Sequence, residues 1–136
     1  MTHFEKLQER MLRFLLVEDD DDHAEIVFRS LRQERVGNKL DRVKDGMEAL
    51  AYLRREGEYA SKPKPDIVLL DLKLPKLSGH EVLAAMKGDP TLRDIPVVIL
   101  STSDAENDMI KAYQHHANSY LVKPLDTEIV RRKVAV

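Results

Sequence analysis

The chain of 136 residues contains no cysteine and no tryptophan, and aromatic side chains account for only 5% of it. Without cysteine, a disulfide framework and thiolate-bound zinc or iron–sulfur sites are excluded, and nothing points to secretion. An excess of charge of one sign is also absent, because the chain has 22 lysines and arginines and 24 aspartates and glutamates. This near balance argues against general nucleic-acid binding.

Long hydrophobic runs are missing as well. The longest, such as 67–70 and 96–100, span about five residues, whereas a membrane helix needs about 20. The first ten residues alternate in charge and lack the apolar region of a signal peptide. We therefore expect one domain over residues 1–136, with no membrane contact and a cytoplasmic location.

Short apolar segments alternate with longer amphipathic ones along the chain. Apolar side chains at helical spacing predict helices in the amphipathic segments. Continuous apolar stretches predict buried strands at 14–17, 67–71, 96–101 and 119–122, and the more polar segment 40–43 predicts a strand at a sheet edge. The helices are expected from Asp22 to the Gly37-Asn38 pair, over 47–53, around 82–86, over 105–115 and from Asp126 or Thr127, with a short helix at 3–11 ahead of the first strand.

The order of these elements is a strand followed by a helix, five times over. Strands that are apolar throughout favour a parallel sheet covered on both faces. Right-handed crossovers then give an α/β fold of three layers, a doubly wound five-stranded sheet. Ligands of such folds bind outside the carboxyl ends of the strands, so that edge is where functional side chains are expected.

Charged or hydroxyl side chains stand at the carboxyl ends of four predicted strands. Several carboxylates in one pocket repel one another unless they bind a proton or a metal ion, and oxygen ligands select a hard cation such as Mg²⁺. A lysine adds a positive charge for a phosphate oxygen, so the set predicts a phosphoryl site. The residues are Glu18, Asp19 and Asp20 after the first strand, Asp71 at the end of the third, Ser101 and Thr102 at the fourth, and Lys123 after the fifth.

The histidines are not part of that set. His115 and His116 have no partner at metal-binding spacing. The remaining histidines, His3, His23 and His80, are isolated along the chain. The sequence therefore favours oxygen ligands alone for the metal ion.

Four motifs in order carry more information than any one of them. They are 16–20 (Leu-Val-Glu-Asp-Asp), 69–75 (Leu-Leu-Asp-Leu-Lys-Leu-Pro) with Gly79 eight residues after Asp71, 99–103 (Ile-Leu-Ser-Thr-Ser) and 120–124 (Tyr-Leu-Val-Lys-Pro). Asp71 precedes Ser101 by 30 residues, and Ser101 precedes Lys123 by 22. On these motifs, residues 13–133 resemble the receiver domain of two-component response regulators. The finer resemblance is to single-domain regulators that partner phytochrome-type histidine kinases.

The resemblance implies a flavodoxin-like sheet with strand order 2-1-3-4-5. It implies that Asp71 accepts a phosphoryl group from the phosphohistidine of a kinase, after which the output surface of the receiver switches. It also implies a site for Mg²⁺ (or Mn²⁺) formed by Glu18, Asp19, Asp71 and the backbone carbonyl of Lys73. Residues 1–12 would be a helical extension of the receiver.

Further roles follow from the same resemblance. Ser101, with Thr102 beside it, would hydrogen-bond a phosphoryl oxygen, and Lys123 would pair with the phosphate. Tyr120 would be the aromatic switch residue. A cis bond at Pro124 would orient the side chain of Lys123, and Gly79 would be a structural glycine.

The partners expected are a histidine kinase of the phytochrome type and a second copy of the chain. The homodimer, or a contact with another partner, would form through the fourth helix, the fifth strand and the last helix, because the last helix has a thin apolar face of Ile129, Val130 and Val134. No nucleic acid or membrane partner is expected. The receiver would promote only its own phosphorylation chemistry and turn over no outside substrate.

Two other classes of function remain open on the sequence. A phosphatase of the haloacid-dehalogenase type uses similar groups but needs a second aspartate two residues after its nucleophile, where this chain has Lys73. A pseudo-receiver would bind partners without phosphorylation, although all the carboxylates and Lys123 are present.

Overall fold

A computed structural model describes residues 12–32, 38–102, 106–123 and 132 of the chain. Its centre is a five-stranded parallel sheet in the order β2-β1-β3-β4-β5, as the flavodoxin-like resemblance predicted. The strands are β1 (Leu12–Val17), β2 (Asn38–Val43), β3 (Ile67–Asp71), β4 (Val97–Ser101) and β5 (Ser119–Val122). All five predicted strands are confirmed, with the polar one at an edge.

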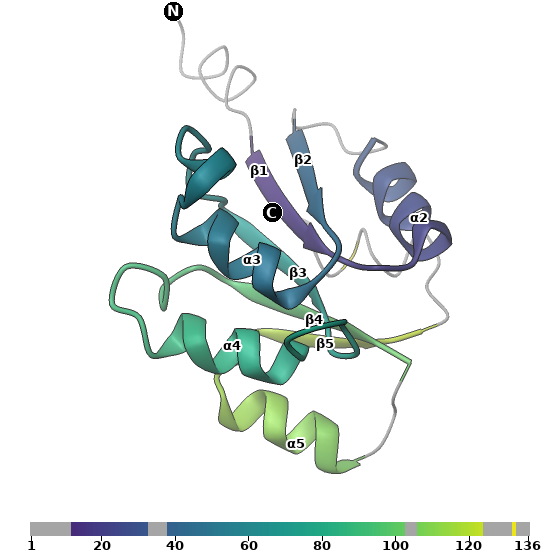
Figure 1. Cartoon of the computed structure of the whole chain (residues 1–136). Helices are drawn as coiled ribbons and strands as arrows, with labels where there is room; N and C mark the ends of the chain where they lie inside the picture. The colour runs from purple at the N-terminus through teal and green to yellow at the C-terminus, as the bar shows by residue number, and fades with distance from the viewer. Residues whose placement is uncertain (1–11, 33–37, 103–105, 124–131, 133–136) are drawn as a thin grey trace, which may run out of the picture.

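The described helices lie on both faces of the sheet. In Figure 1, α3, α4 and α5 cover one face and α2 lies on the other. Their bounds are α2 (Asp21–Arg32), α3 (Gly46–Leu53), α4 (Gly79–Lys87) and α5 (Glu106–Gln114), and a short 3-10 turn, η1 (Gly57–Tyr59), interrupts the predicted loop 56–65. The predicted helix at 3–11 lies outside the described residues, as does the predicted last helix except for Arg132.

Side-chain caps explain where three of these helices begin. The backbone N–H groups of Asp22 and His23 both donate to Oδ1 of Asp20, which therefore caps α2. Asp45 accepts from the backbone of Glu48 in the same way at the start of α3. Ser78 and Glu81 form a complete capping box at the start of α4. Each cap follows the carboxyl end of a strand or the loop after it, so the caps also order the edge of the sheet where a ligand would bind.

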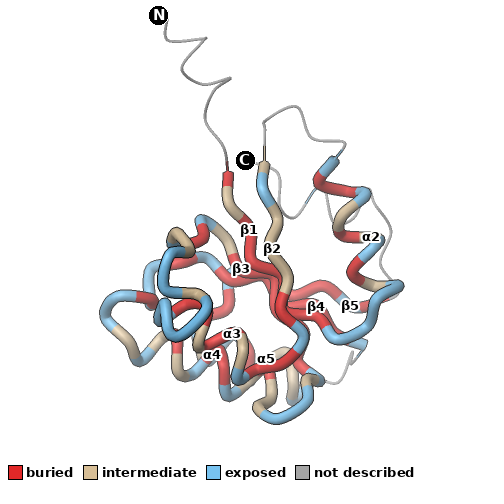
Figure 2. Tube along the Cα trace, turned by 45° about the horizontal axis from the view of Figure 1, so that its top comes forward, coloured by how far each residue is buried: buried red, intermediate tan, exposed pale blue. Residues whose placement is uncertain are grey.

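The core consists of two apolar layers, one on each side of the sheet. Alternate residues of β1 point to opposite faces: Phe14 and Leu16 pack with α2, whereas Leu15 and Val17 pack beneath α3 and α4. Figure 2 shows that most of β1, β3 and β4 is buried. None of the helices in the described ranges combines the length and the hydrophobicity that crossing a bilayer requires.

Candidate functional site

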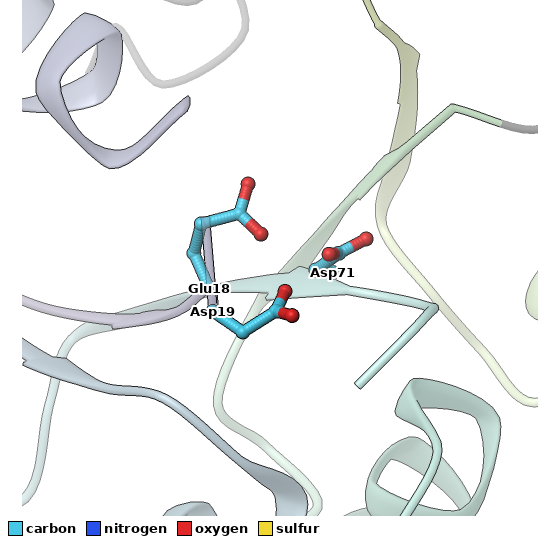
Figure 3. Close-up of side chains that lie close together, drawn as sticks. All are labelled: Glu18, Asp19 and Asp71. Atoms are coloured by element: carbon cyan, nitrogen blue, oxygen red, sulfur yellow. The ribbon is translucent and has the colours of Figure 1, made fainter. Parts of the chain in front are cut away.

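Three carboxylates meet at the carboxyl edge of the sheet, as the sequence predicted. Glu18 and Asp19 follow β1, and Asp71 is the last residue of β3, its neighbour in the sheet. Figure 3 shows the three side chains together, and one oxygen of each lies within 4.8 Å of the others. Glu18 and Asp71 are buried, whereas Asp19 is exposed. Such a cluster has either to take up protons or to bind a cation.

Glu18 is the most constrained member of the cluster. Its side chain is fully buried, and its Oε2 atom has no hydrogen-bond partner among the described residues. Burial, and next the neighbouring Asp71, raise the pKa of Glu18 from 4.5 to about 8, against the opposing effect of Lys123. A buried carboxylate oxygen without a partner is costly unless a ligand satisfies it. With two further carboxylates alongside, this oxygen fits a hard divalent cation such as Mg²⁺.

Lys123 brings the positive charge of the site. Its Nζ atom lies 2.5 Å from Oε1 of Glu18 and 3.5 Å from Oδ2 of Asp71, and its side chain is only 4% exposed. The backbone N–H of Lys123 donates to the carbonyl oxygen of Ser101 at 2.6 Å, which continues the β4–β5 ladder by one residue. Lys123 is therefore held inside the cluster by both its backbone and its side chain.

The predicted phosphate-binding and switch residues lie near this edge, with different exposures. Ser101 is buried at the end of β4, one residue beyond Leu100, the register partner of Asp71. Thr102 is exposed. Tyr120 is buried in the core layer beneath α3, α4 and α5. The tyrosine thus points into the core, and its role as a switch residue stays a prediction.

Gly79 occupies a place that no other residue fits. A Cβ atom there would lie 2.2 Å from the carbonyl oxygen of Asp71 and 2.6 Å from Cα of Leu72. The backbone N–H of Gly79 donates to the carbonyl of Leu72 at 2.8 Å, so α4 begins directly against the strand that ends in Asp71. The structural role assigned to Gly79 thus has a steric cause.

Two predicted features of the site, the Lys73 carbonyl ligand and the cis bond at Pro124, stay predictions. Lys73 is exposed, and its backbone N–H approaches Oδ1 of Asp71 at 3.4 Å. The role of its carbonyl as a metal ligand stays a prediction. Pro124, with its predicted cis bond, lies outside the described residues.

Two residues at the site were missed by sequence reasoning. His23, which the sequence left isolated, places Nδ1 2.8 Å from Nζ of Lys123 and 3.4 Å from Oε1 of Glu18. Arg42 on β2 donates from Nε to the carbonyl of Glu18 at 2.9 Å and from Nη1 to Asp21 at 2.8 Å. The sequence signal for His23 is its place three residues after the cap Asp20, in the first turn of α2 beside the strand ends. Arg42 has no such signal.

The order of the strands and this set of side chains can be compared with known proteins. A model of the response regulator receiver domain matches residues 14–135. The chain belongs to this family. Receiver domains are signalling modules of two-component systems, and the function predicted from the resemblance, acceptance of a phosphoryl group, is that of the family.

The relatives refine this assignment. The probable methanogenesis regulatory protein FilR2 of Methanothrix harundinacea is 45% identical over 120 residues, 88% of this chain and 77% of the relative. The phosphorylated cyanobacterial phytochrome response regulator RcpA has 45% identity and a TM-score of 0.84, covering 92% of this chain and 89% of that one. The Mn²⁺-bound form of Rcp1, a response regulator from Synechocystis sp., has 41% identity and a TM-score of 0.83, covering 90% and 88%. The predicted resemblance to phytochrome response regulators is confirmed.

Proposed function

We propose that Asp71 is the phosphoryl acceptor of this receiver. The observation that carries the proposal is the cluster itself: Asp71 ends β3 beside two further carboxylates and 3.5 Å from the ammonium group of Lys123. Phosphoryl transfer depends on positioning and charge neutralisation rather than on covalent chemistry by the protein. A buried carboxylate beside an ammonium group, at the edge of a rigid sheet, supplies both.

We also propose that Glu18, Asp19 and Asp71 hold a divalent cation, Mg²⁺ or Mn²⁺, with the backbone carbonyl of Lys73 as a further ligand. Support comes from the all-oxygen donor set, from the unpartnered Oε2 atom of Glu18 and from the Mn²⁺-bound form of the relative Rcp1. When bound, such an ion neutralises charge that develops on phosphoryl oxygens.

The side chains would act in the transfer as follows. An oxygen of Asp71 attacks the phosphorus of a phosphohistidine, the P–N bond breaks, and its electron pair stays on the imidazole nitrogen, which then takes a proton from water. Lys123 faces the developing charge on an equatorial oxygen. Ser101, with Thr102 beside it, hydrogen-bonds a phosphoryl oxygen once the acyl phosphate has formed. Tyr120 then changes its packing beneath α5.

The donor we propose is a histidine kinase of the phytochrome type, because RcpA is a phytochrome response regulator. The receiver turns over no outside substrate in this proposal. The receiver would form one domain over residues 1–136, with residues 1–12 as an extension. The cytoplasmic location stays a prediction from the sequence.

A homodimer is the second part of the proposal. Its predicted face includes α5 and β5, where Ile110, Tyr113 and Val122 are exposed apolar side chains. Met109, Ile110 and Tyr113 line a shallow apolar hollow together with Gln114. Exposed apolar side chains gathered on one face are typical of an interaction surface. A second copy of the chain would cover this face.

Incubation with acetyl phosphate and Mg²⁺, followed by intact mass measurement, tests the acceptor. We expect the wild type to gain one phosphoryl group and Asp71→Asn to gain none. Asp22→Asn removes an exposed carboxylate from the same acidic segment and should label like the wild type. Chelation of Mg²⁺ should abolish labelling. Labelling of Asp71→Asn at the wild-type rate would refute the assignment.

The same preparation separates the alternative functions. Turnover of a chromogenic phosphate ester would favour a phosphatase over a receiver. A wild type that binds Mg²⁺ and never labels would favour a pseudo-receiver, against the acceptor role of Asp71.

A further inference from the structure

Lys123 has three acceptor groups around its ammonium. Nζ lies 2.5 Å from Oε1 of Glu18, 2.8 Å from Nδ1 of His23 and 3.5 Å from Oδ2 of Asp71. An ammonium group has three N–H donors and no lone pair. Each donor therefore has one candidate acceptor in this site, and the histidine supplies the second shortest of the three contacts.

His23 reaches this position because of the way α2 begins. Its backbone N–H donates to Oδ1 of the cap residue Asp20 at 3.0 Å, which places its side chain in the first turn of the helix, beside the strand ends. The imidazole is 31% exposed, so it stands at the entrance of the cluster rather than in the core. Because the ammonium can only donate, Nδ1 of His23 has to accept, and the ring proton belongs on Nε2.

We propose that His23 is a positioning residue for Lys123. By accepting one N–H through Nδ1, it fixes the end of a long, flexible side chain between Glu18 and the phosphoryl acceptor. This inference rests on the proposed roles of Asp71 and Lys123. A lysine held in advance meets the charge on the transferred phosphoryl group without first being ordered, which is the advantage of preorganised electrostatic groups. His23 touches no reacting atom.

Two substitutions separate the acceptor from the bulk of the side chain. His23→Leu fills the space and removes the acceptor, whereas His23→Asn places an amide oxygen close to the position of Nδ1. We expect His23→Leu to slow acetyl phosphate labelling about tenfold at saturating Mg²⁺, which corresponds to the loss of one hydrogen bond to a charged group. His23→Asn should recover most of the rate. His115→Leu, a histidine that follows α5, is the matched control and should label like the wild type.

Nitrogen NMR of the imidazole gives a readout that a purely structural role would not move. For the neutral ring of His23 we expect the Nε2–H tautomer, with an Nδ1 signal shifted as a hydrogen-bond acceptor. Lys123→Met should return that signal to the value of a free ring nitrogen. An unchanged Nδ1 signal in Lys123→Met would overturn the proposal.

The labelling outcomes also separate this inference from the proposed function. A wild type that does not label at Asp71 removes the proposed function and this inference with it. A wild type that labels normally, alongside a His23→Leu variant of equal rate, overturns the inference alone. Equally slow His23→Leu and His23→Asn variants would also overturn it, because the acceptor would then not be the feature that matters.

Discussion

Glu18 and Lys123 are in buried contact through only one oxygen of the Glu18 carboxyl group. Oε1 lies 2.5 Å from Nζ of Lys123, while Oε2 has no hydrogen-bond partner among the described residues. Removal of two charges from water is costly, and the attraction within such a pair offsets the cost only when the remaining hydrogen-bonding positions are also satisfied. In the metal-free protein that condition is not met, which agrees with the raised pKa of Glu18.

The first prediction concerns the stability of the metal-free protein as a function of pH. The pKa of Glu18 is about 8 in the folded chain and 4.5 without the fold, so the folded state holds an extra proton between these values. The free energy of unfolding contributed by Glu18 is therefore complete below about pH 4.5 and is lost as the pH rises through about 8. Glu18→Gln should lack this decline. Chemical denaturation in EDTA at several pH values measures the free energy of unfolding of both proteins. A difference in this free energy between the wild type and Glu18→Gln that stays constant with pH would contradict the prediction.

The second prediction concerns the metal ion, which competes with that proton. Since the ligand has to be a carboxylate, Mg²⁺ binding should weaken about tenfold per pH unit below the pKa of Glu18. Calorimetric titration in two buffers of different ionisation enthalpy should show release of about one proton near neutral pH. The proton release should vanish in Glu18→Gln. Binding that is independent of pH between 6 and 8 would argue against Glu18 as a ligand.

The third prediction uses Gly79, the first residue of α4, and Gly88, the residue that caps its C-terminus. Gly79→Ala forces a methyl group to within 2.2 Å of the carbonyl oxygen of Asp71, whereas Gly88→Ala meets nothing closer than 3.3 Å and has φ −82°. We expect Gly79→Ala to cost about 1–3 kcal/mol, as overpacking does, and to slow labelling because the strand end carrying Asp71 is displaced. Gly88→Ala should change the stability by less than about 1 kcal/mol. Equal melting temperatures for the two variants would contradict the steric argument.

The strands and their ends were the part of this fold that the sequence predicted well. Segments such as 67–71 are apolar throughout because they are covered on both faces, and a parallel sheet brings their carboxyl ends to one edge. For that reason Glu18, Asp71 and Lys123 could be assigned to one site from their places in the chain. The ends of the strands were predicted less accurately. The strand β1 starts at Leu12, two residues before the predicted start, and Leu12 pairs with Asn38 of β2.

Contacts made by side chains across the sequence were harder to predict. Arg42 lies on the polar edge strand β2, 24 residues from the Glu18 carbonyl to which it donates, and nothing in its local pattern marks it. His23 depends on the direction in which the first turn of α2 faces, which is set by the Asp20 cap and the strand beneath. Periodicity predicts which face of an element is buried, and it does not predict which neighbour a long polar side chain reaches.

The fourth prediction concerns charge repulsion in the metal-free site. Asp19 is exposed, and one of its carboxylate oxygens lies within 4.8 Å of an oxygen of Glu18 and an oxygen of Asp71. At about pH 9, where Glu18 is ionised, Asp19→Asn should stabilise the metal-free protein by on the order of 1 kcal/mol, the Coulomb energy of such a pair screened as in bulk water. It should also weaken Mg²⁺ binding.

Asp22→Asn makes the same charge change in the first turn of α2, where a negative charge is favourable. It should bring no stabilisation and leave Mg²⁺ binding unchanged. Thermal melts in EDTA, with calorimetric titration of Mg²⁺, compare the two variants. Equal effects on stability from both would mean that net charge, and not the cluster, decides.

The fifth prediction tests the proposed homodimer. Ile110 on α5 is 46% exposed beside the apolar hollow, and Met47 on α3 is 56% exposed on another helix of the same face of the sheet. If the dimer forms through α5 and β5, Ile110→Asp places a charge in the interface and removes an apolar side chain whose burial contributes about 1.5–3 kcal/mol. This loss should weaken dimerisation about tenfold or more. Met47→Asp makes an equivalent surface change away from α5 and should dimerise like the wild type. Sedimentation at several concentrations, with and without acetyl phosphate, measures the association. A wild type that stays monomeric in every condition would refute the homodimer. An equal loss of dimer affinity in both variants would mean that the interface is not centred on α5, because only an interface on α5 distinguishes Ile110 from Met47.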